Sequence, residues 1–284
     1  MRRLLALVLA AVALTGCGVR IDGPDPSPSA PTLDEVLRQR EALRAEALAA
    51  TDGGDLGTQV TAHAARQLEA LGGVWIAWPQ GDGPTPTPAP SADVVVAPGA
   101  EGLLAALDRT TPDLVAATGE VAAPELARLF AAIATARTAD AEGLAGALGA
   151  ARELPALPVE IHSADPAVAR ALDAAAWVLE AAAARSRAAG EDPGPLTERA
   201  SLLRGLGEFV VTANGWSGTP GDPREAWYPL DAADDLAGLE ADLARVLVAA
   251  VGAPEGRDGL LQAARNCAAL AARGGADVGP LPGL

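Results

Sequence analysis

The sequence predicts an all-α protein, because apolar residues recur at helical spacing, helix-start signals precede them, and strand-like segments are scarce. Apolar residues at positions i, i+3, i+4 and i+7 lie on one face of a helix and form an apolar stripe along it. Three such stripes are present: Leu126, Leu129, Phe130 and Ile133; Leu202, Leu203, Leu206, Phe209 and Val210; and Leu236, Leu239, Leu243, Val246 and Leu247. Only residues 94–96 and 159–161 resemble strands, and both are short and have proline nearby.

Two helix starts are marked by capping signals. Thr32 and Glu35 have the spacing of a capping box, in which the threonine and the glutamate satisfy each other's backbone N–H groups. Asp165 followed by Pro166 fits an N-cap residue with proline at the first helical position. We therefore expect helices to begin directly after these positions.

Eight helices are expected, in two sets of four. The first set covers residues near 33–50, 56–71, 100–118 and 123–141, and the second covers residues near 165–189, 197–213, 232–251 and 255–273. In each set a long connection rich in Pro, Gly and Trp separates the second helix from the third. Connections this long are uncommon inside a compact bundle.

A four-helix bundle with one long crossover is the ferritin-like arrangement, because two consecutive parallel helices need a connection that spans the bundle. We expect a ferritin-like helical domain over residues 164–284 and a second helical, bundle-like unit over residues 32–150. One larger bundle that mixes helices from both sets remains an alternative.

The second half of the chain also resembles the uncharacterised ferritin-like domain of actinobacterial lipoproteins. In that family a Tyr-x-Leu-like segment precedes the third helix, and a Pro-Gly-Leu-like tail ends the chain. Tyr228-Pro229-Leu230 and Pro282-Gly283-Leu284 match these motifs. Members usually carry a Glu-His pair early in the first helix of the domain, but the stretch from Ala171 to Trp177 has alanines there. The resemblance therefore implies the fold and not a metal site.

The histidines give no independent support for metal. A carboxylate-bridged di-iron site needs Glu-x-x-His on one helix face, and neither His63 nor His162 has an acidic residue three positions before it. Glu160 and His162 form a conceivable ligand pair, but both histidines fit a surface or capping role better. We expect no metal site and no cofactor, with a diverged iron-binding protein as the alternative.

The N-terminus is typical of an exported lipoprotein. Arg2 and Arg3 precede an apolar run from Leu4 to Leu14 that is too short to span a membrane. Leu14-Thr15-Gly16-Cys17 resembles a bacterial lipobox, in which cleavage occurs before a lipidated cysteine. We expect residues 1–16 to be a signal peptide and residues 17–31 to be a Pro-rich tether that begins at lipidated Cys17. A secretory signal with an unrelated cysteine is the alternative.

Composition limits the partners. The formal net charge is -16, all 21 basic residues are arginine, and no basic cluster is present, so we expect no nucleic-acid partner. The expected partner is the cell membrane, reached from its extracytoplasmic face through the lipid on Cys17. Cys267 then remains as the single other thiol, and its Ala-rich helical context favours a buried residue over a reactive one.

Aromatic residues are concentrated in the two long connections. Trp75, Trp78, Trp216, Trp227 and Tyr228 lie there, and they form the candidate interaction surface. The alternative, which we favour, is that these rings pin irregular loops onto the helices. No Gly-x-Ser-x-Gly elbow and no phosphate-binding loop with lysine is present, so no catalytic residue is predicted. The sequence favours a noncatalytic interaction or envelope module over an enzyme.

Overall fold

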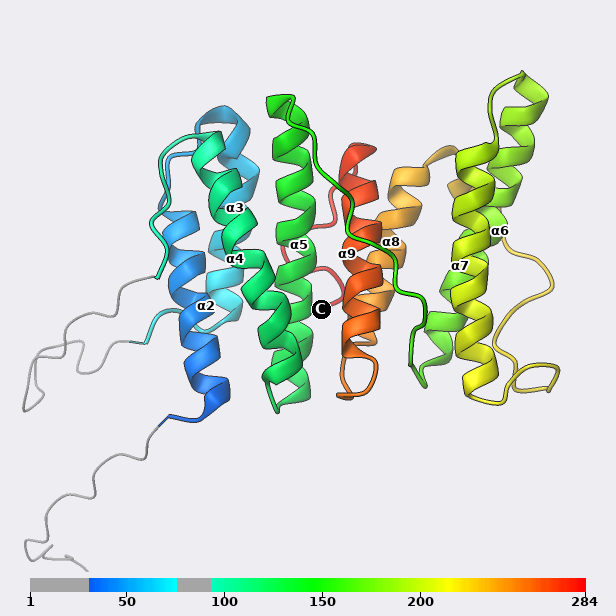
Figure 1. Cartoon of the computed structure of the whole chain (residues 1–284), viewed down its shortest axis with the longest axis horizontal. Coiled ribbons are helices and arrows are strands. Elements are labelled where there is room, and N and C mark those ends of the chain that lie inside the picture. The colour runs from blue at the N-terminus through cyan, green and yellow to red at the C-terminus, as the bar shows by residue number, and fades with distance from the viewer. Residues whose placement is uncertain (1–30, 76–92) are drawn as a thin grey trace, which may run out of the picture. The chain divides into compact units, whose positions relative to one another are not determined.

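The computed structural model describes residues 31–75 and 93–284, and every regular element in these residues is helical (Figure 1). This confirms the all-α class. The elements are α2 (Leu33–Ala49), α3 (Gly54–Ala70), α4 (Ala100–Glu120), α5 (Pro124–Leu148), α6 (Pro166–Ala189), α7 (Gly194–Ala213), the 3₁₀ helix η1 (Asp231–Asp234), α8 (Leu236–Ala249) and α9 (Arg257–Arg273).

Most helix ends fall within a few residues of the predicted ones. Asp165 caps α6 as expected, because its Oδ1 accepts a hydrogen bond from the Ala167 N–H at 2.8 Å and Pro166 is the first helical residue. The largest difference at a helix start is in α8. Asp235 accepts from the Gly238 N–H at 2.8 Å, so α8 begins at Leu236, and the preceding residues form η1.

Residues Leu33–Leu284 form one compact unit. The helices pack first with their neighbours in the chain, as the pairs α2 and α3, α4 and α5, α6 and α7, and α8 and α9. Helix α5 then packs against α9, and α6 packs against α8 (Figure 1). The contact between α5 and α9 joins the two sets of four helices, so one core draws side chains from both sets.

Helix α5 lies at the centre of this packing, and most of its length is buried. Phe130 and Ile133, from the predicted apolar stripe, have no exposed surface, whereas Leu126 and Leu129 are half-buried. Alanines occupy much of the rest of α5, and their small side chains let neighbouring helices approach closely. Polar residues of α5 such as Arg137 and Asp140 are buried as well, so its polar residues do not gather on a solvent-exposed face, which explains the weak amphipathic pattern outside the stripe.

The connection between α5 and α6, residues 149–165, runs across α9 (Figure 1). It contains residues 159–161, one of the strand-like segments, and it forms no strand. Asn266 donates from Nδ2 to the Pro155 carbonyl at 2.6 Å, and Arg273 donates from Nη2 to the Arg152 carbonyl at 2.6 Å. Side chains of α9 therefore hold this extended connection in place. Among the described helices, none combines the length and the apolar character needed to cross a membrane.

Candidate functional site

The predicted aromatic surface is divided between buried and exposed positions. Cys17 and Trp78 lie outside the described residues. Tyr228 is buried; its hydroxyl donates to Asp173 Oδ2 at 3.0 Å and accepts from the Glu225 N–H at 2.9 Å. Trp216 is half-buried against the core.

Trp75 and Trp227 are exposed over 65% and 66% of their surface. They belong to the connections that follow α3 and α7, two helices that do not pack extensively against each other. Tyr228 and Trp216 therefore fit the role of holding a loop against the helices, whereas Trp75 and Trp227 remain candidates for an interaction surface.

His63 is buried, so the expectation of a surface or capping role is wrong for this residue. Its Nδ1 lies 2.9 Å from Asp140 Oδ1 on α5, and its Nε2 lies 3.8 Å from Asp277 Oδ2 in the C-terminal tail. Burial opposes protonation of the imidazole, but the hydrogen bond and charge of Asp140, with the charge of Asp277, outweigh it and raise the pKa of His63. The histidine thus links α3 to α5 and to the tail.

This arrangement predicts a pH dependence of stability. Because the folded-state pKa of His63 lies above its ordinary value of 6.5, the stabilisation is complete below that pH and is lost as pH rises through the folded-state pKa. Denaturant unfolding between about pH 6 and 9 should show a falling free energy of unfolding, and the fall should be smaller in His63→Gln. An equal fall in both proteins would contradict this interpretation.

The other predicted reactive side chains have structural roles. Cys267 is fully buried, as favoured from the sequence, and burial raises the pKa of its thiol. Arg199 lies beside it and pairs with Glu240, with Nη2 to Oε2 at 2.7 Å. His162 is exposed, and its Nε2 lies 3.3 Å from Glu160 Oε1. Within residues 31–75 and 93–284, no three His, Cys, Asp or Glu side chains are arranged to hold a metal ion.

A buried ion cluster joins α2, α3 and α5. The Glu41 carboxylate has no exposed surface; Oε2 accepts from Arg137 Nη1 at 3.0 Å, and Oε1 accepts from Arg44 Nη1 at 2.9 Å. Arg137 also donates from Nε to Gln67 Oε1 at 3.3 Å. Arg44 continues to the exposed edge, where its Nη2 donates to Asp113 at 2.8 Å. Glu41 therefore links α2 to α5, and Arg137 extends the link to α3.

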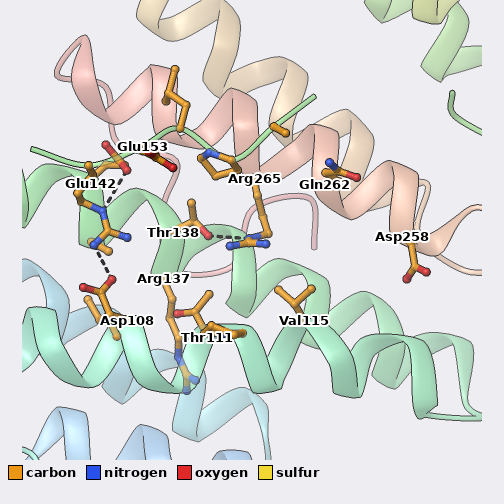
Figure 2. Close-up of a pocket in the computed structure, with 17 residues that line it drawn as sticks. Asp108, Thr111, Val115, Arg137, Thr138, Glu142, Glu153, Asp258, Gln262 and Arg265 are labelled. Carbon is orange, nitrogen blue, oxygen red and sulfur yellow. Dashed lines mark hydrogen bonds and ion pairs between the residues drawn. The ribbon is translucent and has the colours of Figure 1, made fainter. Parts of the chain in front are cut away.

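Next to this cluster a pocket of about 490 Å³ lies between α4, α5, α9 and the connection after α5 (Figure 2). Its size is in the range of sites for small organic molecules. Its polar lining comes from all four elements: Asp108 and Thr111 from α4, Arg137, Thr138 and Glu142 from α5, Arg152 and Glu153 from the connection, and Asp258, Gln262 and Arg265 from α9.

Two of the three arginines that line the pocket form ion pairs with carboxylates. Arg152 bridges Glu142, with Nε to Oε1 at 3.1 Å, and Asp108, with Nη1 to Oδ1 at 2.5 Å. Arg137 contributes its stem to the lining, and Figure 2 shows its side chain turning away from Arg265. The remaining arginine, Arg265, extends from α9 into the pocket, and its Nε donates to Thr138 Oγ1 at 3.0 Å (Figure 2).

No sequence argument pointed to this pocket, because its residues are separated along the chain and belong to ordinary helix surfaces when considered alone. Asp258, Gln262 and Arg265 have the spacing of one helix face, but a polar face on a helix ordinarily indicates exposure to solvent. No family model, no curated protein and no solved structure matches this chain.

Proposed function

We propose that this protein is a lipoprotein held on the extracytoplasmic face of a bacterial cell membrane by lipid on Cys17. We further propose that residues 33–284 act there as a noncatalytic helical module. The observation that carries the proposal is the lipobox-like Leu14-Thr15-Gly16-Cys17, placed directly after a basic pair and a short apolar run.

The position at which the compact unit begins supports this reading. The unit starts at Leu33, and Cys17 precedes it in the sequence. The sequence between them is Pro-rich, and such segments extend by ~3 Å per residue. A lipid on Cys17 could then anchor the protein without straining the fold. Two or more acyl chains are needed for stable attachment.

A noncatalytic role is supported by the use of the chemically capable side chains. Cys267 is buried, and the Glu41 carboxylate is held by arginines. Tyr228 is held by Asp173, in the stretch where the resembled family carries its Glu-His pair. These groups bind helices to one another. The pairing of α6 with α7, α8 with α9 and α6 with α8 is compatible with the ferritin-like order that we propose for this half.

Metabolic labelling tests the anchor. In bacterial cells that express the chain and are fed an alkyne fatty acid, the native protein should carry the label. Cys17→Ser should lose it, because the thiol is the acceptor of the diacylglycerol. Cys267→Ser is the matched control, since it removes the single other cysteine, which is buried, and should keep the label. Label that persists in Cys17→Ser, or is absent from the native protein, would contradict the proposal.

A further inference from the structure

Arg265, which is half-buried, makes fewer hydrogen bonds than the buried Arg257 on the same helix. Arg257, also on α9 and without a carboxylate partner, is satisfied by backbone carbonyls: Nε and Nη2 donate to Gly252 at 3.1 and 2.9 Å, and Nη1 donates to Val121 at 2.7 Å. Arg265 makes one hydrogen bond in the described part of the chain, from Nε to Thr138. Its Nη1 and Nη2 have no partner there, and Arg265 lines the pocket.

The electrostatic surroundings of Arg265 leave its charge unbalanced. Burial, and then the nearby charge of Arg152, lower the pKa of Arg265. No carboxylate lies within ion-pair distance of Arg265 among the described residues, whereas Arg152 and Arg273 both pair with Glu142. An anion in the pocket would supply the missing partner.

A second unpaired group lies in the wall of the same pocket. Thr111 is 95% buried, and its hydroxyl has no hydrogen-bond partner. Most buried hydroxyls are paired, and the adjacent Thr110 donates to the Ala106 carbonyl at 2.9 Å. Figure 2 shows Thr111 on α4 across the pocket from Arg265 on α9. A ligand between the two helices could therefore bond to a guanidinium on one side and to a hydroxyl on the other.

The charge of the lining limits the number of negative charges on the ligand. Asp108 and Glu142 are held by Arg152, whereas Glu153 and Asp258 are exposed and make no ion pair among the described residues. These free carboxylates would repel a polyanion. A single carboxylate fits the planar, two-pronged donor set of Arg265. We propose that this pocket binds a small organic monocarboxylate, with its carboxylate on Arg265 and a hydrogen bond from Thr111.

Ligand titration tests the proposal on the purified full-length protein in detergent. The probes are pyruvate, L-alanine, citrate and inorganic phosphate, each at up to about 10 mM and constant ionic strength, followed by calorimetry and by the unfolding midpoint Tm. Pyruvate or L-alanine should bind and raise Tm, and citrate and phosphate should bind more weakly. Arg265→Met should weaken the binding at least about tenfold, because a charge-assisted pair is lost.

The variants also separate binding from folding. Arg265→Met keeps the apolar stem and loses one hydrogen bond to Thr138 but no ion pair, so the ligand-free Tm should change little. Thr111→Val should weaken binding with an unchanged or higher ligand-free Tm, since it removes an unpaired hydroxyl. Arg66→Met, at an exposed position paired with Glu69, is the control and should bind as the native protein does. Unchanged affinity in Arg265→Met, preferred binding of citrate or phosphate, or no binding of any probe would overturn the proposal.

Discussion

Replacing Glu41 with leucine is expected to lower the free energy of unfolding by about 3–5 kcal/mol. The substitution leaves Arg137, which is 1% exposed, as a buried cation without its carboxylate, 3.0 Å away in the native protein. Removing one partner of a buried pair costs far more than the pair contributes, because the remaining charge has neither water nor a counter-ion. Urea unfolding followed by circular dichroism measures the loss.

The double variant Glu41→Leu with Arg137→Met should recover most of the lost stability, because two apolar side chains can replace a buried pair at little cost. Glu69→Ala is the control for a pair at the surface. Glu69 and Arg66 lie 3.0 Å apart but are exposed over 73% and 69% of their side chains, so the change should stay within about 0.5 kcal/mol. A double variant as unstable as Glu41→Leu would show that the cluster acts through packing and not through charge.

Gly256→Ala is the second substitution with a large expected effect, a loss of roughly 3–5 kcal/mol. Gly256 precedes α9 with φ of 92°, a conformation that L residues rarely adopt. A Cβ there would lie 1.9 Å from the carbonyl oxygen of His162, which belongs to the connection across α9. The carbonyl is backbone and the backbone of residue 256 fixes the Cβ position, so neither can rotate away, and the connection must shift.

Gly190→Ala separates the two causes of this loss. Gly190 ends α6 with φ of 83°, but a Cβ there would have no neighbour within 4 Å. Its loss should be about 1–2 kcal/mol, the cost of the left-handed conformation alone. Equal losses at Gly190 and Gly256, measured by urea unfolding, would contradict the close approach of the connection to α9.

The helices could be predicted from the sequence because their signals are local. Apolar spacing and caps such as Asp165-Pro166 act within one or two turns, and the structure bears out the all-α class. The contact between α5 and α9 could not be predicted in this way. Periodicity shows which face of a helix is buried, but it does not identify the helix that covers that face.

The buried polar contacts could not be predicted from the sequence for a related reason. Glu41 and Arg137 are 96 positions apart, and Arg265 and Thr138 are 127 positions apart. A single charged residue on a helix looks like a solvated surface residue until its partner is known. The burial of His63 could not be predicted for the same reason, since its partners Asp140 and Asp277 lie on other elements. The pocket around Arg265 became visible only when α4, α5 and α9 were placed together.

Mass spectrometry of the N-terminal peptide tests the membrane anchor most directly. Trypsin cleaves after Arg20, so a protein processed before Cys17 releases the peptide Cys17-Gly18-Val19-Arg20. We predict that this peptide, from protein purified out of bacterial membranes, carries a diacylglycerol on the cysteine sulfur and that no peptide covering residues 4–16 remains. An unmodified Cys17, or an intact peptide from Leu4 to Arg20, would contradict the lipid anchor.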